Sequence, residues 1–327
     1  MSAPQPSVRP DGPLRAVTTR KVNTDVKDVA MSGQCFYLGT HETSWIGRAG
    51  VPLFISHRRL ARLKRTLPKA IAPFALDSGG FSELSLFGGW RTTPLEYVQA
   101  VVRYDREIGK LDWAASQDWM NEPDMLARTG LTVREHQRRT VANYIELVAL
   151  WDQHSDASCP FMPTVQGYLP AQYRDCLMMY ADAGVDLGAS PIVGVGSVCR
   201  RQHTDEIRAV LEVILETEPE CELHGFGVKH RGLAIYGDYL TSFDSTSWSI
   251  NARKNPRLPG CTHVSCSNCM LWALRWRRNV VGGAWCSRHG EWCQGFGGGY
   301  CGDFIAPEIG CAATPQWMHS AHDRLAG

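Results

Sequence analysis

The stretch Phe74-Ala75-Leu76-Asp77-Ser78-Gly79-Gly80-Phe81 decides the fold, because a short apolar run ends abruptly in an acid and two glycines. Further along, Thr93-Pro94-Leu95-Glu96 has the pattern of a capping box with proline at the first helical position, and it predicts a helix through about Ile108. A second apolar run, Leu111–Ser116, follows that helix. Because parallel strands need a long crossover between them, this order of segments predicts a parallel sheet.

The same alternation continues along the chain. Further helices are predicted from about Val133 to Trp151, from Pro170 to a cap at Gly184, and from a cap at Thr204. The strands are predicted near Cys35–Leu38, Pro52–Ser56, Phe74–Leu76, Leu111–Ser116, Phe161–Val165, Val185–Leu187, Leu223–Gly227 and Leu240–Phe243. About eight strands fit an α/β fold with a closed (β/α)8 TIM-like barrel better than an open sheet, although counting alone leaves the open sheet as an alternative.

The 327 residues suit one such barrel, and 44% of them are hydrophobic, enough for a sizeable core. We expect a flexible N-terminal arm at 1–30, the barrel at 31–255, and a Cys-rich, zinc-binding C-terminal subdomain at 256–327 that completes the barrel. No apolar run approaches the roughly 20 residues that span a bilayer, so no membrane partner is predicted. We expect a cytoplasmic protein, in the host cytoplasm if it is phage-encoded, whose cysteines stay reduced.

Polar residues follow the predicted strands at the point where each one ends. They are Asp77, Gln117-Asp118, Gln166-Gly167, Gly194-Val195-Gly196-Ser197 and Asp244. In a barrel all these positions meet at the mouth formed by the carboxyl ends of the strands, where active sites form. A single carboxylate there is often only a helix cap. Three carboxylates, an amide and two glycine-rich turns together predict a site.

Three acids at one mouth suit chemistry at a sugar carbon. One carboxylate can attack the anomeric carbon while another moves protons, as in retaining glycosidases. A purine would be held by an acid that accepts from its N–H groups, an amide that contacts its carbonyl, and aromatic faces.

Three of these segments resemble a known family. Asp77-Ser78-Gly79-Gly80-Phe81 resembles the DSGGF/Y segment of tRNA-guanine transglycosylases, and Val165-Gln166-Gly167 resembles their VQG turn. The run Phe243-Asp244-Ser245-Thr246-Ser247-Trp248 resembles the FDSxSY/W segment of archaeosine-type members, in the same order along the chain. The likeness covers roughly residues 35–290 and is closest to the DpdA-type DNA-guanine transglycosylases, which place a 7-deazaguanine in DNA.

The resemblance implies a role for each matching position. Asp244 matches the nucleophile that attacks C1′, and Asp77 matches the carboxylate that moves the proton. Asp118 matches the acid that binds the guanine N1–H and amino edge, and Gln166 matches the amide at O6. The remaining substrate-binding positions are Ser78 and Gly79, the purine-binding turn at Gly194, Val195 and Gly196, and the stacking residues Phe81 and, by a looser match, His224.

The C-terminal quarter of the chain carries seven of the twelve cysteines, which indicates a metal site in a reducing compartment. The family's zinc motif is CxCxxC followed by a distant histidine. Here Cys261, His263 and Cys266 keep that spacing with histidine in the middle, and Zn²⁺ accepts both ligand types. Cys269 and His289 are alternative fourth ligands. Cys286, His289, Cys293 and Cys301 would make a second metal site or complete the first.

The stretch from Ser245 to Gly290 contains no Asp or Glu, although the whole chain carries a net charge of only +1. Such a cationic segment favours a phosphate-binding face over a solvated surface without a partner. The residues expected to contact the nucleic-acid backbone are Arg253, Lys254, Arg275, Arg277 and Arg278. A second basic run lies at 58–65, for which a backbone contact and a solvated helix face are both open.

The predicted function is exchange of guanine in DNA for a 7-deazaguanine, such as preQ0 or a derivative. Whether the protein forms a homodimer, as its relatives do, is left open by the sequence. One alternative is the same chemistry on tRNA, and another is an inactive nucleic-acid-binding barrel. A metal-dependent barrel hydrolase is a third, but histidines are scarce at the predicted strand ends.

Overall fold

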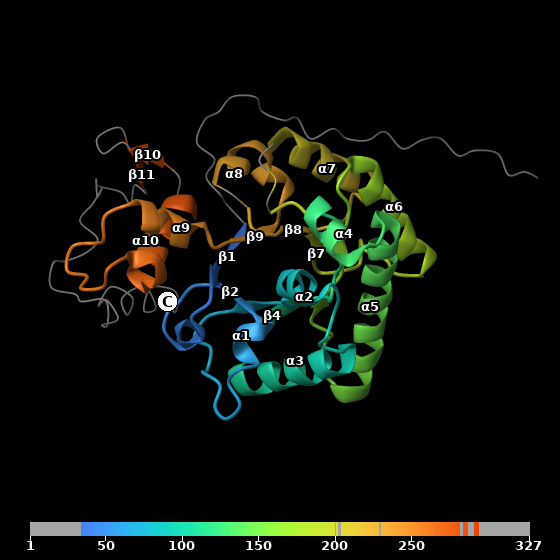
Figure 1. Ribbon diagram of the computed structural model, residues 1–327, viewed down its shortest axis with the longest axis horizontal. Helices are drawn as coiled ribbons and strands as arrows, with labels where there is room; N and C mark the ends of the chain where they lie inside the picture. The colour runs from blue at the N-terminus through green and yellow to red at the C-terminus, as the bar shows by residue number, and fades with distance from the viewer. Residues whose placement is uncertain are drawn as a thin grey trace, which may run out of the picture.

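The structure is a computed structural model that describes residues 34–199, 201, 204–228, 230–281, 284–286 and 291–293. The predicted arm at 1–30 lies outside the described residues, as does most of the chain beyond 281. The barrel predicted from the alternation of strands and helices is confirmed, since parallel strands form a nearly closed ring with helices around it (Figure 1).

The main sheet is parallel throughout and has the order β5-β4-β3-β2-β1-β9-β8-β7-β6. Its strands are β1 (Cys35–Thr40), β2 (Leu53–Ser56), β3 (Phe74–Asp77), β4 (Leu111–Ala115), β5 (Phe161–Met162), β6 (Thr164–Val165), β7 (Val193–Val195), β8 (Leu223–Gly225) and β9 (Ser242–Ser245). Only Pro163 separates β5 from β6, the two ends of this order, and proline has no N–H to donate to a ladder. The predicted strand at 161–165 therefore closes the ring, because β5 pairs with β4 and β6 pairs with β7.

Helices follow most of the strands and cover the outside of the ring (Figure 1). They are α1 (His57–Leu60), α2 (Gly80–Phe87), α3 (Pro94–Ile108), α4 (Pro123–Thr129), α5 (Val133–His154), α6 (Pro170–Asp182), α7 (Thr204–Thr217), α8 (His230–Tyr236), α9 (Ser247–Lys254) and α10 (Met270–Val281). The capping box predicted at the start of α3 is present: the Thr93 hydroxyl accepts from Glu96 N at 3.3 Å, and the Glu96 carboxylate accepts from Thr93 N at 2.8 Å.

The strand predicted at Val185–Leu187 is wrong. The chain turns there after the left-handed Gly184, and Asp186 Oδ1 accepts from Ala189 N at 3.2 Å. Leu187 is buried in the core as a loop residue. The strand begins only at Val193, so Gly194 and Val195 belong to β7 and the purine-binding turn predicted around them starts one or two residues later. A short apolar run is ambiguous because burial does not require a strand.

Aromatic side chains fill the inside of the ring. Tyr37, Trp113 and Met162 form a buried cluster there, with Phe54 and Phe226 packed against it. Two larger clusters lie outside the strands, between the sheet and the helices. The interior is therefore a packed core, as in other barrels of this size, and leaves the strand ends as the place for a site.

The chain beyond β9 returns to the ring. Helix α9 leads to a turn at Cys266–Asn268, and α10 then packs its Met270, Ala273 and Leu274 into the cluster that also holds Leu38 of β1. Strands β10 (Ala284–Cys286) and β11 (Glu291–Cys293) form a separate antiparallel pair. The boundary predicted at 255/256 stays a prediction. No helix among the described residues is both long and apolar enough to cross a membrane.

We predict that Thr93→Ala lowers the free energy of unfolding by about 1 kcal/mol, because the first turn of α3 loses the hydroxyl that accepts from Glu96 N. Urea unfolding measured by circular dichroism tests this. Gln99→Ala, an exposed position within the same helix, is the matched control and should change the stability by less than about 0.5 kcal/mol. Equal effects of the two substitutions would show that the cap does not stabilise the protein.

Candidate active site at the mouth of the barrel

Three carboxylates meet at the carboxyl ends of the strands, as predicted. Asp77 ends β3, Asp118 follows β4, and Asp244 lies in β9. They act on one another electrostatically, since Asp244 raises the pKa of Asp77 and Asp77 raises the pKa of Asp118, in each case as an addition to the effect of burial. The sequence thus placed the three acids in one site, although their roles stay predictions.

Asp77 is held at the end of its strand by neighbouring groups. The Ser56 hydroxyl and the backbone N–H of Gly79 hydrogen-bond to its carboxylate, and Ser56 also faces Asp77 in the register of β2 and β3. Burial raises the pKa of Asp77 above its ordinary value, the two hydrogen bonds oppose this shift, and the charge of Asp244 adds to it. A carboxyl group with a raised pKa can hold or release a proton closer to neutral pH.

The pKa of the Asp118 carboxyl group is strongly raised. Burial raises its pKa to about 7, and the charge of Asp77 contributes in the same direction. The Gln166 amide N–H donates to the Asp118 carboxylate, which favours the charged form and limits the shift. The side chain is therefore divided between its acid and its carboxylate near neutrality.

Gln166 connects the ends of three strands. It follows β6, and its amide N–H donates to Asp118 beyond β4. Its Oε1 lies 2.7 Å from the hydroxyl of Ser197, which follows β7. Ser197 has the unusual positive φ of 56° and also contacts the buried Glu122, 2.9 Å away. A Cβ at Gly196 would overlap the Gln166 side chain, so a glycine is required there.

The contacts recorded for the Asp244 carboxylate both reach Oδ1. The Gly227 N–H donates to it at 2.9 Å, and His224 Nε2 lies 3.4 Å away. The other ring nitrogen of His224 is 2.8 Å from the Ser242 hydroxyl. Burial lowers the pKa of His224, so the ring is neutral at pH 7 and carries one proton. With Nε2 facing a carboxylate, that proton belongs on Nε2, and the Ser242 hydroxyl then donates to Nδ1.

His224 is fully buried and does not occupy the stacking position expected from the sequence. Its ring packs against Trp113, at 4.6 Å between centroids, and against Phe226, at 4.9 Å. It therefore belongs to the aromatic filling of the barrel, directly below Asp244. Its position is that of a group that holds the carboxylate, not of an open face for a base.

The DSGGF segment lies at the mouth. Gly79 adopts a left-handed φ of 85°, which a glycine tolerates best, and it lets Arg58 pack closely, since a Cβ there would lie 2.8 Å from Arg58 Cγ. Ser78 is buried. Phe81 is 38% exposed in the first turn of α2, a placement compatible with the stacking role predicted for it.

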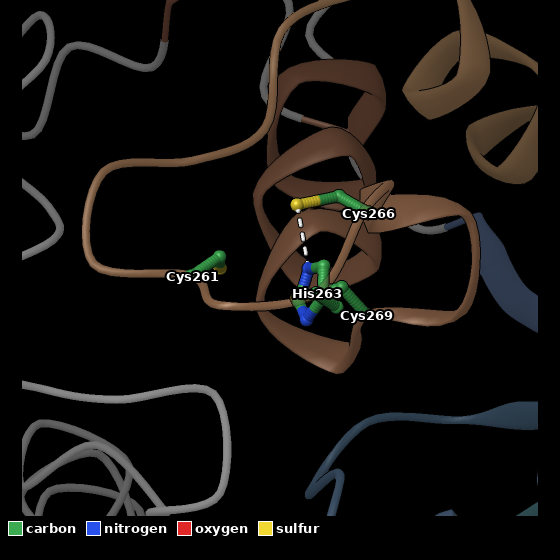
Figure 2. A group of neighbouring side chains, drawn as sticks. All are labelled: Cys261, His263, Cys266 and Cys269. Carbon is green, nitrogen blue, oxygen red and sulfur yellow. Dashed lines mark hydrogen bonds between the residues drawn. The ribbon is translucent and has the colours of Figure 1, made fainter.

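The predicted metal ligands come together outside the mouth. Figure 2 shows the side chains of Cys261, His263, Cys266 and Cys269 gathered at the turn before α10. Their ligand atoms all lie within 4.8 Å of one another, and His263 Nε2 is 3.0 Å from Cys266 Sγ. Three thiols and one imidazole in such a cluster can hold a metal ion. Of the two alternative fourth ligands, the structure brings Cys269 to the cluster, whereas His289 lies outside the described residues.

The basic residues expected to bind phosphates differ in how far they are exposed. The Arg277 guanidinium lies over the Phe36 ring and donates to the Phe36 carbonyl at 3.1 Å, so part of its hydrogen-bonding capacity is used within the protein, and its contact with a phosphate stays a prediction. Burial lowers its pKa to about 10. Arg275 and Arg278 are half-buried, whereas Arg253 and Lys254 are exposed at the end of α9. Sequence shows the charge of these residues but not the helix face that carries each one.

Two further residues of the mouth follow early strands. The sequence places polar groups after these strands at Thr40-His41-Glu42 and at Ser56-His57-Arg58-Arg59, where a position at the rim and a satisfied loop position are both open. In the structure the Ser56 hydroxyl bonds to the Asp77 carboxylate, and His41 acts electrostatically on Asp77, which places both at the rim. Glu122, which precedes α4 and contacts Ser197, was not predicted.

These features define a TIM-barrel protein. Its mouth holds three coupled carboxylates and a bridging amide, and a separate Cys-His cluster can hold a metal ion. The chain belongs to the DpdA family, described as DeoxyPurine in DNA protein A, whose match covers residues 32–297. The family supports a transglycosylase-like role in DNA modification, with DNA as the substrate. No curated protein matches the chain.

We predict that one aspartate of this protein titrates with a midpoint of about pH 7 and that Asp118→Asn removes this titration, because burial raises the pKa of Asp118. NMR of protein labelled with ¹³C at aspartate carboxyls measures it. Gln166→Leu should move the midpoint upward, since the carboxylate loses a donor. The assignment fails if every aspartate titrates near pH 4.

Proposed function

We propose that this protein is a DNA-guanine transglycosylase that exchanges guanine in DNA for a 7-deazaguanine through a covalent bond to Asp244. The observation that supports this most directly is the mutual coupling of Asp77, Asp118 and Asp244 around one mouth, beside the Gln166 amide. The incoming base expected from the sequence, preQ0 or a derivative, is part of the same proposal.

In the first step Asp244 Oδ2 attacks C1′ of a guanosine turned out of the DNA stack. An ester bond to the sugar forms, the bond between C1′ and N9 breaks, and the departing guanine takes a proton from Asp77. The raised pKa of Asp77 suits it to carry that proton. Turning the nucleotide out costs a few kcal/mol, which contacts in the pocket must offset.

In the second step a 7-deazaguanine occupies the vacated pocket. Its N9–H proton passes to Asp77, N9 attacks C1′, and the ester bond breaks to restore the Asp244 carboxylate. One N-glycosidic bond replaces another, so the exchange needs no ATP. The same acid serves both halves of the reaction because each half reverses the proton transfer of the other.

The base is held by the two groups at the closure of the barrel. The Asp118 carboxylate accepts from the N1–H and amino group of the purine, and the second hydrogen of the Gln166 amide donates to O6. Gln166 is already oriented for this, because its first hydrogen is bonded to Asp118 and its oxygen faces Ser197. Phe81 stacks on the base from the rim.

Gly227 and His224 set which oxygen of Asp244 reacts. Both reach Oδ1, by a bond of 2.9 Å and a contact of 3.4 Å, so Oδ2 is the oxygen turned toward the sugar. A carboxylate fixed in this way loses little rotational freedom when it attacks, and this lowers the entropic part of the barrier.

The metal is proposed to be zinc with a structural role. Three buried thiols and an imidazole fit a closed tetrahedral site, which leaves no open position for a substrate. The cluster packs with Ala252 of α9, Leu258 and Leu271 of α10. When bound, zinc would tie together the segment 261–269, which connects α9 after the Asp244 strand to α10.

We predict that Asp244→Asn lowers guanine exchange into DNA by at least about a thousandfold, because an amide cannot form the sugar ester. DNA binding should persist, since the backbone donor of Gly227 and the shape of the side chain remain. Incorporation of labelled guanine into DNA, compared with tRNA, measures the reaction and separates the two nucleic acids.

Asp112→Asn is the matched control for this experiment. Asp112 lies at the start of β4, far along the strand from the mouth, and accepts from the Tyr37 hydroxyl at 2.9 Å. The Asp112→Asn variant should exchange guanine at the rate of the unaltered protein. If Asp244→Asn retains exchange, Asp244 is not the nucleophile. If guanine enters tRNA alone, DNA is not the substrate.

For the metal we predict one zinc per chain from the cluster, with most of it lost in Cys269→Ser and retained in His289→Ala, because Cys269 completes the four ligands. Elemental analysis of purified protein measures this, and the thermal midpoint should fall in Cys269→Ser. Two zinc ions per chain, or loss in His289→Ala instead, would assign the fourth ligand differently.

A further inference from the structure

A pocket outside the barrel mouth is lined by more basic than acidic side chains. It lies between α1 and α3, which are neighbours in Figure 1 and are joined by the contact of His57 Nδ1 with the Tyr104 hydroxyl, at 3.1 Å. Its volume is about 430 Å³, within the range of pockets that take small ligands. Its charged lining residues are Lys64, Arg91, Arg103 and Glu96.

The charges of this pocket leave two cations for a ligand. Arg103 is paired with Glu107 at 3.0 Å and also donates to the Leu63 carbonyl, so it holds the loop after α1. Glu96 is bound to the backbone of Thr93 in the helix cap. Lys64 and Arg91 have no ion pair among the described residues.

His57 adds no charge to the pocket. Burial lowers its pKa to about 4, and the nearby cations Arg58 and Lys64 act in the same direction, against the charge of Glu83. The imidazole is therefore neutral at pH 7. Two free cations, a neutral polar wall and room for a small ligand favour an anion such as a phosphate group.

The pocket is rigidly placed by buried contacts. Glu83, only 3% exposed, accepts from Arg91 N at 2.8 Å and pairs with Arg58 at 2.5 Å. The Arg91 guanidinium lies 4.4 Å from the centre of the Phe87 ring, which limits its orientation. These contacts hold the cation before any ligand arrives.

The pocket is close to the catalytic mouth in the chain and in space. His57 directly follows Ser56, which hydrogen-bonds to Asp77, and Arg58 packs against Gly79 of the DSGGF segment. Arg58, Phe87 and Arg91 then connect that segment to the pocket. A DNA strand whose base enters the mouth would have its neighbouring phosphates within reach of this pocket.

We propose that the pocket binds a backbone phosphate of the DNA strand whose guanine is exchanged, with Lys64 and Arg91 as its cations. This proposal rests on DNA being the substrate. It gives a function to Lys64 of the basic run at 58–65, and it supplies a phosphate contact in addition to Arg277, whose guanidinium donates to the Phe36 carbonyl. Phosphate contacts of this kind fix the position of the strand and are independent of its sequence.

The test measures DNA binding by the full chain across a range of salt concentrations, using labelled single-stranded and double-stranded oligonucleotides. Lys64→Ala with Arg91→Ala should weaken binding by about tenfold near 0.15 M salt and make the slope of log K against log salt shallower by about 1. The loss should be uniform across sequences. Lys64→Arg with Arg91→Lys should restore the slope, which a structural role would not predict.

Lys69→Ala with Arg106→Ala is the matched control, because it removes one lysine and one arginine that do not line the pocket. Lys69 is exposed and precedes Ala70, whose N–H bonds to Ile108 at the end of α3, and Arg106 is exposed in the last turn of that helix. This pair should leave binding unchanged. If the pocket variant binds like the control, the phosphate site is refuted while DNA remains the partner. If the unaltered protein binds neither oligonucleotide, the proposed substrate fails and the pocket's role with it.

Discussion

The Gln166 amide joins the barrel at the place where the ring of strands closes. One end of the amide is bonded to Asp118 beyond β4, and the other end faces Ser197 beyond β7. The strand between them, interrupted at Pro163, is the one that completes the ring. The same side chain thus links the ends of three strands and orders the acid that has the most perturbed pKa of the site. Architecture and chemistry depend on a single hydrogen-bonded group.

A balance between hydrogen-bond donors and burial explains why three acids can share this mouth. Each carboxylate is kept by donors that favour its charged form: Ser56 and Gly79 for Asp77, Gln166 for Asp118, and Gly227 for Asp244. Desolvation and mutual repulsion oppose these donors and raise the pKa of Asp77 and Asp118. Two acids with raised pKa beside a third carboxylate of fixed geometry is the arrangement that proton transfer and covalent attack require.

The sequence predicted the parts of the structure that have short-range signals. The capping box at Thr93 and the acids at the carboxyl ends of β3, β4 and β9 were predicted from adjacent residues, and the barrel follows from the alternation of segments. The false strand at Val185–Leu187 shows the limit, because burial in a loop and burial in a strand select the same apolar residues. Long-range facts were out of reach: that His224 lies below Asp244, and that Arg277 turns inward to Phe36. Both contacts depend on which face of a strand or helix packs against the neighbouring element, and the amino-acid composition does not contain that information.

The neutral histidine below Asp244 has a consequence for reactivity. A lysine or arginine in its place would bind the free carboxylate more strongly than the half-formed ester, whose negative charge has partly left the oxygen, and would deepen the ground state. An uncharged imidazole, 3.4 Å from Oδ1, orients the group while withdrawing little electron density. A buried carboxylate held by a neutral neighbour is restrained in position and keeps the negative charge that it needs to attack.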